Sequence, residues 1–504
     1  MEVLGFLAHG FAVALTPTHI GLALLGCFLG TLIGALPGLG PSNGVAILIP
    51  LAFSLGLPAT SALILLTSVY YGAMYGGRIS SILLNIPGDE PALMTTLDGH
   101  PMARAGRAGE ALALSGVASF AGAFLATLGL LLFAPLLARF ALAFGPAEYF
   151  ALYVLAFATL GGVAGGNPAK ALLAAGLGLA LALVGYDTTT GTPRYTFGVM
   201  ELFEGIDFLV AIVGLFAVSE VFLFLERGRS ALPPIAAVGR ITVPLATLLR
   251  SLPAMLRGTA LGFFAGILPG AGASLGSFLA YALEKRVSDR EGTFGRGDPR
   301  GVAAPEAGNN AAAGGALIPM LTLGVPGSGT TAVLLAMLMA LGVTPGPLLF
   351  AQKPDVVWGL VAALFVANLV LLALNLPLVG LFVRLLALPS WILMPTVLLV
   401  AFLGVYSISN NAFDLLLMIA FGILGYLLRK LEVPLVPIIL GILLGNEMED
   451  NLRRALLIAN GDWSILIASP LARGLWIAAL LGLAAPVILG RLLARRRRML
   501  LARE

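Results

Sequence analysis

Apolar segments long enough to cross a membrane follow one another along most of this chain. Of its 504 residues, 59% are hydrophobic and only 11% are charged, whereas a soluble protein has roughly 25% charged residues. An ordinary soluble fold is therefore excluded. Because one crossing takes about 20 apolar residues, the sequence predicts an all-α polytopic membrane protein with about 12 (10–14) transmembrane helices.

Other classes of function find little support in the residues. Cys27 is the single cysteine, so the chain forms no internal disulfide and no cysteine-based metal cluster. His9, His19 and His100 lack metal-ligand spacing, and no Gly-x-x-x-x-Gly-Lys phosphate loop is present. The net charge of +4 comes from basic residues in loops and at the tail. We therefore expect no nucleic-acid partner, no cofactor and no enzymatic activity.

Basic residues gather in a few segments and sort the ends of the apolar runs by side. These segments hold Arg104 and Arg107, residues 226–257, the loop Lys285–Arg300, the pair Arg429 and Lys430, and the tail Arg495–Arg498. Because cytoplasmic loops of membrane proteins carry an excess of Lys and Arg, the sequence predicts that these segments and the C-terminus are cytoplasmic. Arg453, Arg454 and Arg473 fit less well, since the same path places them outside.

Glycine-rich strings of the first half recur in the second. Gly34–Gly40 (GALPGLG) recurs as Gly266–Gly272 (GILPGAG) at an offset of 232 residues. The pairs Gly76-Gly77 and Pro87-Gly88 recur as Gly314-Gly315 and Pro326-Gly327, at offsets of 238 and 239. Self-similarity at a fixed spacing is the signature of a repeat, so the chain consists of two related halves.

Equivalent loops of the two halves carry opposite charge. The loop around Arg104 is basic while its counterpart around Pro345 is nearly uncharged, and the loop after Ser54 is uncharged while its counterpart Lys285–Arg300 is strongly basic. Corresponding elements then lie on opposite sides of the membrane, as in the inverted-topology repeats of many secondary transporters. We predict a first membrane repeat over residues 1–226, a cytoplasmic linker over 227–257, a second repeat over 258–490 and a basic cytoplasmic tail over 491–504.

Each half contains two places where Gly and Pro interrupt an apolar run. In hydrocarbon, backbone groups freed by such a break have no water to bond, so breaks persist only where they are buried or line a polar cavity. The freed N–H groups and positive helix ends suit an anion, and the freed carbonyls suit a cation. The alternative interpretation is that the breaks are plain tight turns between helices at the surface.

These re-entrant or broken helices supply most of the predicted substrate-binding residues. In the first half they are Pro37, Gly38, Gly40, Ser42, Asn43, Asn85, Pro87 and Gly88, and in the second half Pro269, Gly270, Gly272, Ser274, Pro326, Gly327, Ser328, Gly329, Thr330 and Thr331. Backbone carbonyls near Gly38 and Gly270 are candidate ligands for Na⁺.

Arg78 stands inside an otherwise uncharged stretch, with Ser81 and Asn85 at i+3 and i+7. One helical face then carries all three residues. A guanidinium fork at membrane depth suits carboxylate recognition, so we add Arg78 and Ser81 to the predicted substrate site. The alternatives are a structural arginine that caps nearby carbonyls and one that reaches the membrane interface.

Glu306, Asn309 and Asn310 share a face just before Gly314-Gly315. Two roles stay open for this group. Glu306 binds a coupling cation or proton, with the two amides beside it, or it fixes the entry of its helix by hydrogen bonding to backbone amides.

Several long strings of the chain resemble those of one known family. They are Tyr71–Gly77 (YGAMYGG), Leu84–Gly88 (LNIPG), Ala103–Glu110 (ARAGRAGE), Ala304–Gly315 (APEAGNNAAAGG) and Gly324–Thr331 (GVPGSGTT). They are similar to the large membrane subunit of the tripartite tricarboxylate transporters, and the similarity runs from about Gly10 to the last spans. Position 78 departs from the family pattern, in which Ser or Thr is common, so the resemblance does not settle the ligand.

The resemblance implies a large permease subunit in the bacterial inner membrane. Its implied partners are a small four-helix membrane subunit and a periplasmic solute-binding protein that delivers an organic carboxylate, with a Na⁺ or H⁺ gradient as the driving force. The strings that match Gly34–Asn43 and Gly266–Ser274 are then the expected transport elements.

The leading hypothesis is a cation-coupled importer of a tricarboxylate or related organic carboxylate that works by alternating access. The alternative is a partner-independent channel or an intramembrane enzyme. An aspartyl-protease dyad built from Asp187 and Asp89 is disfavoured, because the order of its motifs is reversed and the Gly-x-Gly-Asp pattern is missing. The oligomeric state stays open.

Overall fold

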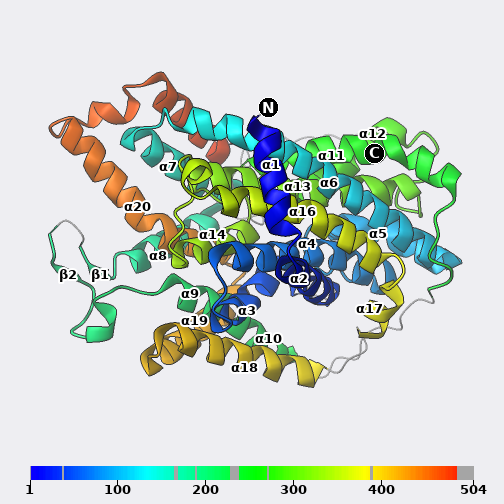
Figure 1. Ribbon diagram of the computed structural model, residues 1–504, viewed down its shortest axis with the longest axis horizontal. Helices are drawn as coiled ribbons and strands as arrows, with labels where there is room; N and C mark the ends of the chain where they lie inside the picture. Colours follow the sequence, from blue (N-terminus) through cyan, green and yellow to red (C-terminus); the bar gives the residue numbers. More distant parts are fainter. Residues whose placement is uncertain are drawn as a thin grey trace, which may run out of the picture. The chain divides into compact units, whose positions relative to one another are not determined.

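The computed structural model describes residues 2–36, 39–163, 168–187, 190–227, 238–268, 272–385 and 390–484. Within these ranges the chain is almost wholly helical (Figure 1). The described strands are β1 (Gly185–Tyr186) and β2 (Pro193–Arg194), which pair antiparallel in one small hairpin. The predicted all-α membrane fold is confirmed.

The helices of the first half are α1 (Glu2–Ala14), α2 (Pro17–Ala35), α3 (Gly40–Ser54), α4 (Ala59–Leu84), α5 (Leu93–Met102), α6 (Ala108–Ala141), α7 (Pro146–Val163), α8 (Pro168–Ala182), α9 (Phe208–Ile212) and α10 (Ser219–Arg227). Those of the second half are α11 (Leu245–Ile267), α12 (Gly272–Ser288), α13 (Pro299–Leu323), α14 (Gly329–Ala340), α15 (Leu349–Gln352), α16 (Pro354–Asn375), α17 (Val379–Leu385), α18 (Ser390–Ser409), α19 (Ala412–Lys430) and α20 (Val436–Ile458). Short π-helical turns, Ala103–Arg107 and Val213–Val218, join α5 to α6 and α9 to α10.

Helix length separates candidate membrane spans from shorter segments. In the described part of the chain, five helical segments are long and apolar enough to cross a bilayer: Pro17–Ala35, Leu93–Ala141, Phe208–Glu226, Pro354–Asn375 and Ala412–Lys430. The apolar helices α3 and α14 have 15 and 12 residues, fewer than the about 20 that a crossing takes. Both begin at predicted breaks, as expected for broken helices, while the total of 10–14 crossings stays a prediction.

The chain forms two compact units. The described residues of the first are 2–36, 39–142, 212–227, 238–268, 272–385 and 390–426, and those of the second are 143–163, 168–187, 190–211 and 427–484. The first unit contains every described residue of the predicted substrate site. The predicted linker over 227–257 overlaps α11, which begins at Leu245, and the repeat boundaries stay a prediction.

Two helix pairs of the first unit pack through glycines spaced four residues apart. On α2, a Cβ added at Gly30 or Gly34 would stand under 3.0 Å from a carbonyl oxygen of α4, at Val69 or Ala73. On α11, Gly262 and Gly266 meet α13 in the same way, at the carbonyl oxygens of Gly308 and Ala312. Small residues at this spacing let two helix backbones approach closely.

These contacts fix the register of the repeat and correct one prediction. Gly76 packs on Thr31 and Ala35 of α2, and Gly315, not Gly314, packs on the equivalent Phe263 and Ile267 of α11. The offset between α4 and α13 is therefore 239 residues throughout. The sequence match was one residue off because both helices carry a Gly-Gly pair, at positions 76–77 and 314–315. Gly314 instead faces Ala126 and the hydroxyl of Tyr71.

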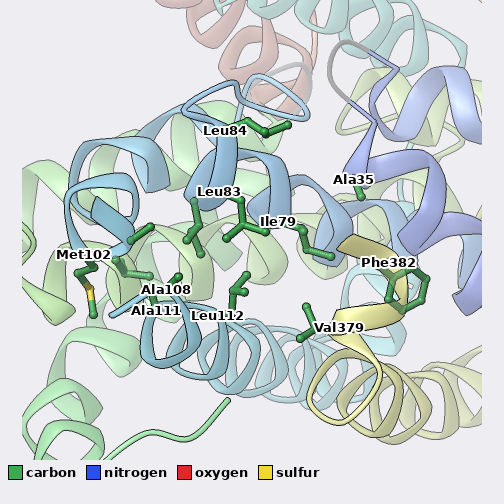
Figure 2. Close-up of a cluster of buried hydrophobic side chains, with 13 residues drawn as sticks. Ala35, Ile79, Leu83, Leu84, Met102, Ala108, Ala111, Leu112, Val379 and Phe382 are labelled. Carbon is green, nitrogen blue, oxygen red and sulfur yellow. The ribbon is translucent and has the colours of Figure 1, made fainter. Parts of the chain in front are cut away.

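An apolar cluster closes one side of α4 (Figure 2). Ile79 and Leu83 of α4 pack with Leu112 of α6 and with Val379 and Phe382 of α17, and all five are at most 1% exposed. Burial of such side chains stabilises by roughly 1.5–3 kcal/mol each. The cluster holds α4 against α6 and α17 next to the turn that carries Arg78.

The second unit is built around α7, α8 and α20. Gly178 of α8 packs directly on Ile438 and Gly441 of α20. Arg453, which fitted the charge-based topology poorly, donates to Asp187 Oδ2 at 2.8 Å and to Glu449 Oε1 at 2.5 Å. Acids of the same unit therefore neutralise this arginine, which makes its charge a weak guide to sidedness.

Candidate functional site

The starts of α3 and α14 meet in the first unit. Ser42 Oγ and Thr330 Oγ1 lie 3.0 Å apart in a hydrogen bond. Tyr70 of α4 extends the contact, since its hydroxyl lies 3.5 Å from Ser328 Oγ. A broken-helix end of the first repeat thus touches one of the second.

The start of α12 makes the opposite contact. Ser274 Oγ donates to Glu90 Oε2 at 3.2 Å, and Ser277 Oγ donates to the Pro91 carbonyl at 2.8 Å. Here a broken end of the second repeat touches the loop between α4 and α5 in the first.

The two contacts are related by exchange of the repeats. Ser274 is the equivalent of Ser42 at the offset of 232. It bonds Glu90, the residue next to Pro91, which is the equivalent of Thr330 at the offset of 239. When a contact recurs with its partners exchanged, the two parts are related by a two-fold axis. The broken ends of the two repeats therefore contact each other, and the inverted topology that the loop charges indicate stays a prediction.

Glycines make the close approach possible at both ends. Gly40 and Gly272 begin their helices with φ of 62° and 60°, a left-handed conformation that only glycine adopts without strain. Gly88 and Gly327 pack on the carbonyl oxygens of Gly34 and Gly266, where a Cβ would stand under 3.0 Å away. These predicted site glycines are required by packing, whatever binds beside them.

Equivalent side chains cap the next helical turn in each repeat. Ser328 begins α14 in a capping box, because Ser328 Oγ accepts from Thr331 N–H and Thr331 Oγ1 accepts from Ser328 N–H. In the first repeat, Asp89 Oδ1 accepts from the Ala92 N–H at 3.0 Å. Asp89 and Ser328 are equivalent at the offset of 239, so a carboxylate stands in one repeat where a hydroxyl stands in the other.

Most of the predicted substrate-binding residues come together at this junction. Asn43, Thr330 and Thr331 are buried, at 6%, 3% and 0% exposure. Gly88, Pro326 and Gly327 are also buried, and a second group is partly buried: Gly40, Ser42, Pro87, Gly272, Ser274, Ser328 and Gly329. The predicted Pro37, Gly38, Pro269 and Gly270, and the Na⁺ ligands near Gly38 and Gly270, lie outside the described residues.

Arg78 is fully buried, at 0% exposure, and bound on the side of α6 and α16. Its Nη1 donates to the Leu112 carbonyl at 2.6 Å and to Ser115 Oγ at 2.7 Å, and its Nη2 donates to Asn375 Oδ1 at 3.1 Å. Asn375 in turn donates to Thr31 Oγ1 of α2. This is the arrangement that the structural alternative requires, an arginine that caps carbonyls, and the substrate role of Arg78 stays a prediction.

Contrary to the sequence prediction, Asn85 does not share a helical face with Arg78 and Ser81, because α4 ends at Leu84. Ser81 Oγ donates back to the Gly77 carbonyl of its own helix at 2.9 Å. Asn85 is the C-cap of α4 with φ of 57°, so the helix stops before it, and its side chain is exposed. The i+7 spacing fails because the left-handed residue turns the chain away from the helix axis.

Glu306 is buried in the middle of the first unit at 0% exposure. Thr95 Oγ1 donates to Oε1 at 2.5 Å and Ser119 Oγ donates to Oε2 at 2.9 Å. The structural role predicted for Glu306 assumed backbone amides as partners, and this is wrong in detail. The α13 helix begins at Pro299 under the cap Asp298, so Glu306 lies two turns in and joins α13 to α5 and α6 through hydroxyls.

Several buried polar atoms of α4, α13 and α16 have no hydrogen-bond partner among the described residues. They are the hydroxyls of Tyr71 and Tyr75, both side-chain atoms of Asn309, and Oδ1 of Asn310 and of Asn368. Buried polar atoms are nearly always paired. These donors and acceptors, which include the predicted Asn309 and Asn310, are therefore available to water or to a polar solute.

Sequence reasoning missed Asp98 and considered Asp89 only as part of a disfavoured protease dyad. Asp98 is 0% exposed, its Oδ1 accepts from the backbone N–H of Gly295, Gly297 and Asp298 at 2.8–2.9 Å, and its Oδ2 accepts from the Tyr281 hydroxyl. Asp98 therefore anchors the loop before α13. The available signal was an acid within a largely uncharged stretch, which in a membrane protein marks a functional or paired group.

The cap of α13 lies in the same loop. Burial opposes ionisation of Asp298, but hydrogen bonds from Arg300 and Thr293 outweigh it and lower the pKa of Asp298. An open cavity of about 480 Å³ next to it is lined by Arg250, Arg257, Glu284 and Arg300 among others. Arg257 pairs with Glu284, and Arg300 pairs with Asp298. Acidic residues of the protein therefore neutralise two of the arginines that line this cavity.

Comparison with known proteins identifies a family and two similar proteins. The model of the tripartite tricarboxylate transporter TctA family matches residues 20–440. An uncharacterized 52.8 kDa protein of Agrobacterium vitis, from the TAR-I ttuC' 3' region, is 42% identical over 475 residues, which cover 94% of each chain. An uncharacterized protein from the TAR-II ttuC' 3' region of the same organism is 42% identical over 222 residues, 44% of this chain and 90% of that protein. No solved structure matches.

Proposed function

Because this chain belongs to the tripartite tricarboxylate transporter TctA family, we propose that it is the permease subunit that imports a tricarboxylate or related organic carboxylate by cation symport. The proposed coupling ion is H⁺ or Na⁺. Its proposed partners are a small four-helix membrane subunit and a periplasmic solute-binding protein. The proposed location is the bacterial inner membrane, with a cytoplasmic C-terminus.

One observation carries this proposal: the exchanged contacts of Ser42 with Thr330 and of Ser274 with Glu90. The starts of α3, α12 and α14 converge there, and helix starts offer free N–H groups and the positive end of the helix dipole to an anion. Hydroxyls beside these N–H groups add donors for carboxylate oxygens. Single hydroxyl contacts contribute only about 1 kcal/mol each, so the two repeats are able to separate and re-form them during alternating access.

The direct test uses proteoliposomes that contain the complete transporter, supplied with loaded binding protein. We expect saturable uptake that accumulates carboxylate against its gradient and stops when both the Na⁺ and the H⁺ gradients are collapsed. Uptake that continues without either gradient would contradict symport. Non-saturating flux that never exceeds equilibrium would instead favour the channel alternative.

A matched pair of variants tests the site itself. Thr330→Val keeps the size of the side chain but removes the bond to Ser42, and we expect at least a tenfold loss of uptake. Thr322→Val is the control, because Thr322 is equally buried but donates only to Ile318 of its own helix. Equal uptake by both variants would remove the helix starts from the proposed site.

A further inference from the structure

Asp89 presents a buried oxygen that nothing in the described structure explains. Its Oδ1 caps the turn at Ala92, but its Oδ2 is closed off from solvent and has no hydrogen-bond partner. No described Lys, Arg or His forms an ion pair with it. Asp89 as a whole is partly buried, but a carboxylate oxygen shielded from solvent without a counter-ion is unfavourable, so a proton or a cation at Oδ2 would stabilise it.

The position of Asp89 connects this group to both repeats. Gly77 and Gly40 lie against the Asp89 side chain. A Cβ added at Gly77 would stand 3.0 Å from Asp89 Oδ1, and a Cβ added at Gly40 would stand 3.7 Å from the Asp89 Cβ. Gly40 starts α3, the helix whose Ser42 bonds Thr330 of the second repeat. Movement of the helix starts during transport would therefore change the surroundings of Asp89 directly.

The second repeat shows that capping alone does not need a carboxylate. Ser328 occupies the equivalent position, caps the equivalent turn and lies against the equivalent Gly272, with 3.8 Å between its Cβ and an added glycine Cβ. A hydroxyl is therefore sufficient for the structural task. The extra, unpartnered oxygen of Asp89 is left for another purpose.

Nearby acids distinguish a proton from a metal ion as the ligand. The described titratable groups in electrostatic range of Asp89 are Glu90, Tyr70 of α4 and Glu306 of α13. Glu90 accepts from Ser274, and both oxygens of Glu306 accept from hydroxyls. One free oxygen suffices for a proton, whereas hard metal cations take several oxygen ligands.

We propose that Asp89 is the carboxylate that carries the coupling proton, a role that rests on the proposed transport function. With the site open to the periplasm, Oδ2 accepts one proton, and the neutral carboxyl no longer repels the incoming carboxylate substrate. With the site open to the cytoplasm, the same O–H bond breaks, the proton passes to water and the carboxylate is restored. Each cycle therefore imports one proton with the substrate through this residue.

The variant Asp89→Asn tests the proposal, since the amide keeps the Oδ1 cap but stays neutral. In proteoliposomes with the complete transporter, we expect at least a tenfold loss of substrate accumulation driven by an inward H⁺ gradient. Counterflow, the exchange of labelled for unlabelled substrate without a gradient, should persist and become independent of pH. Glu201→Gln, which neutralises an exposed acid far along the chain, should behave like the wild type in both assays.

Three outcomes would decide against this role. Accumulation by Asp89→Asn at the wild-type level would overturn it. If Asp89→Asn loses both counterflow and accumulation while its unfolding temperature equals that of the wild type, the role is overturned as well. Wild-type uptake driven by a Na⁺ gradient at equal pH, and not by a pH gradient, would replace the proton with Na⁺. Failure of the wild type to transport under any gradient would refute the proposed function, a result distinct from all three.

Discussion

The two repeats share a scaffold but differ in chemistry. The glycine contacts of α2 with α4 recur in α11 with α13, and the left-handed glycines Gly40 and Gly272 recur with φ values within 2° of each other. Within this common scaffold, the residue of the second repeat equivalent to Asp89 is Ser328, and the residue equivalent to Arg78 of α4 is Leu317 of α13. Packing thus sets what the repeats must share, whereas the buried charges belong to one repeat at a time.

The largest expected effect tests the shared scaffold. Gly34→Ala and Gly266→Ala each place a Cβ under 3.0 Å from a backbone carbonyl, so the helices must move apart. We expect a loss of at least about 3 kcal/mol in stability for both, measured as thermal unfolding and yield in detergent. Gly21→Ala is the control on α2, because nothing lies within 4 Å of its added Cβ. If Gly266→Ala kept its stability while Gly34→Ala lost it, the two repeats would not be equivalent in this contact.

A second prediction concerns the charge that only the first repeat has. Arg78→Leu makes the first repeat match the second at this position, but it leaves Asn375 Oδ1 without its buried donor. We expect a loss of about 3 kcal/mol in stability, measured by thermal unfolding. Arg384→Leu, at an exposed arginine on α17, is the control. Normal stability of Arg78→Leu with lost uptake would return Arg78 to the substrate site.

The third prediction separates Glu306 from Asp89. Glu306→Gln keeps one acceptor for the hydroxyls of Thr95 and Ser119 but loses the second, which should cost about 1–2 kcal/mol of stability. Because both oxygens of Glu306 are already engaged, we expect uptake to keep its dependence on the gradient. Loss of coupling in Glu306→Gln, assayed by accumulation and counterflow, would transfer the coupling role from Asp89 to Glu306.

The smallest expected effect concerns the caps. Ser328→Ala removes the oxygen that accepts from Thr331 N–H, and loss of such a cap costs about 1 kcal/mol. Ser328→Asp restores an acceptor at the same place and should recover stability in thermal unfolding. Recovery would show that either side chain serves as a cap, as the comparison with Asp89 requires. Continued instability would mean that the two positions differ in structure as well as in chemistry.

Much of the fold was predictable because it depends on local patterns. Apolar runs, interrupted by Gly and Pro, determined an all-α membrane protein with breaks at Gly40, Gly272 and Ser328. The recurrence of these strings also identified the repeat. A residue's backbone preference acts over a few neighbours, so composition and spacing along the chain contain this information directly.

The partners of the buried polar groups were decided by the tertiary structure. Arg78 reaches Asn375, 297 residues away, and Thr330 reaches Ser42, 288 residues away. The tertiary structure also decided that Asp98 binds backbone amides near residue 297. It likewise decided that Gly76 is equivalent to Gly315 and not to Gly314, the residue that the sequence match indicated. Which of several chemically similar groups meet depends on how helices pack at a distance, and at such separations the chain imposes no geometric constraint of its own.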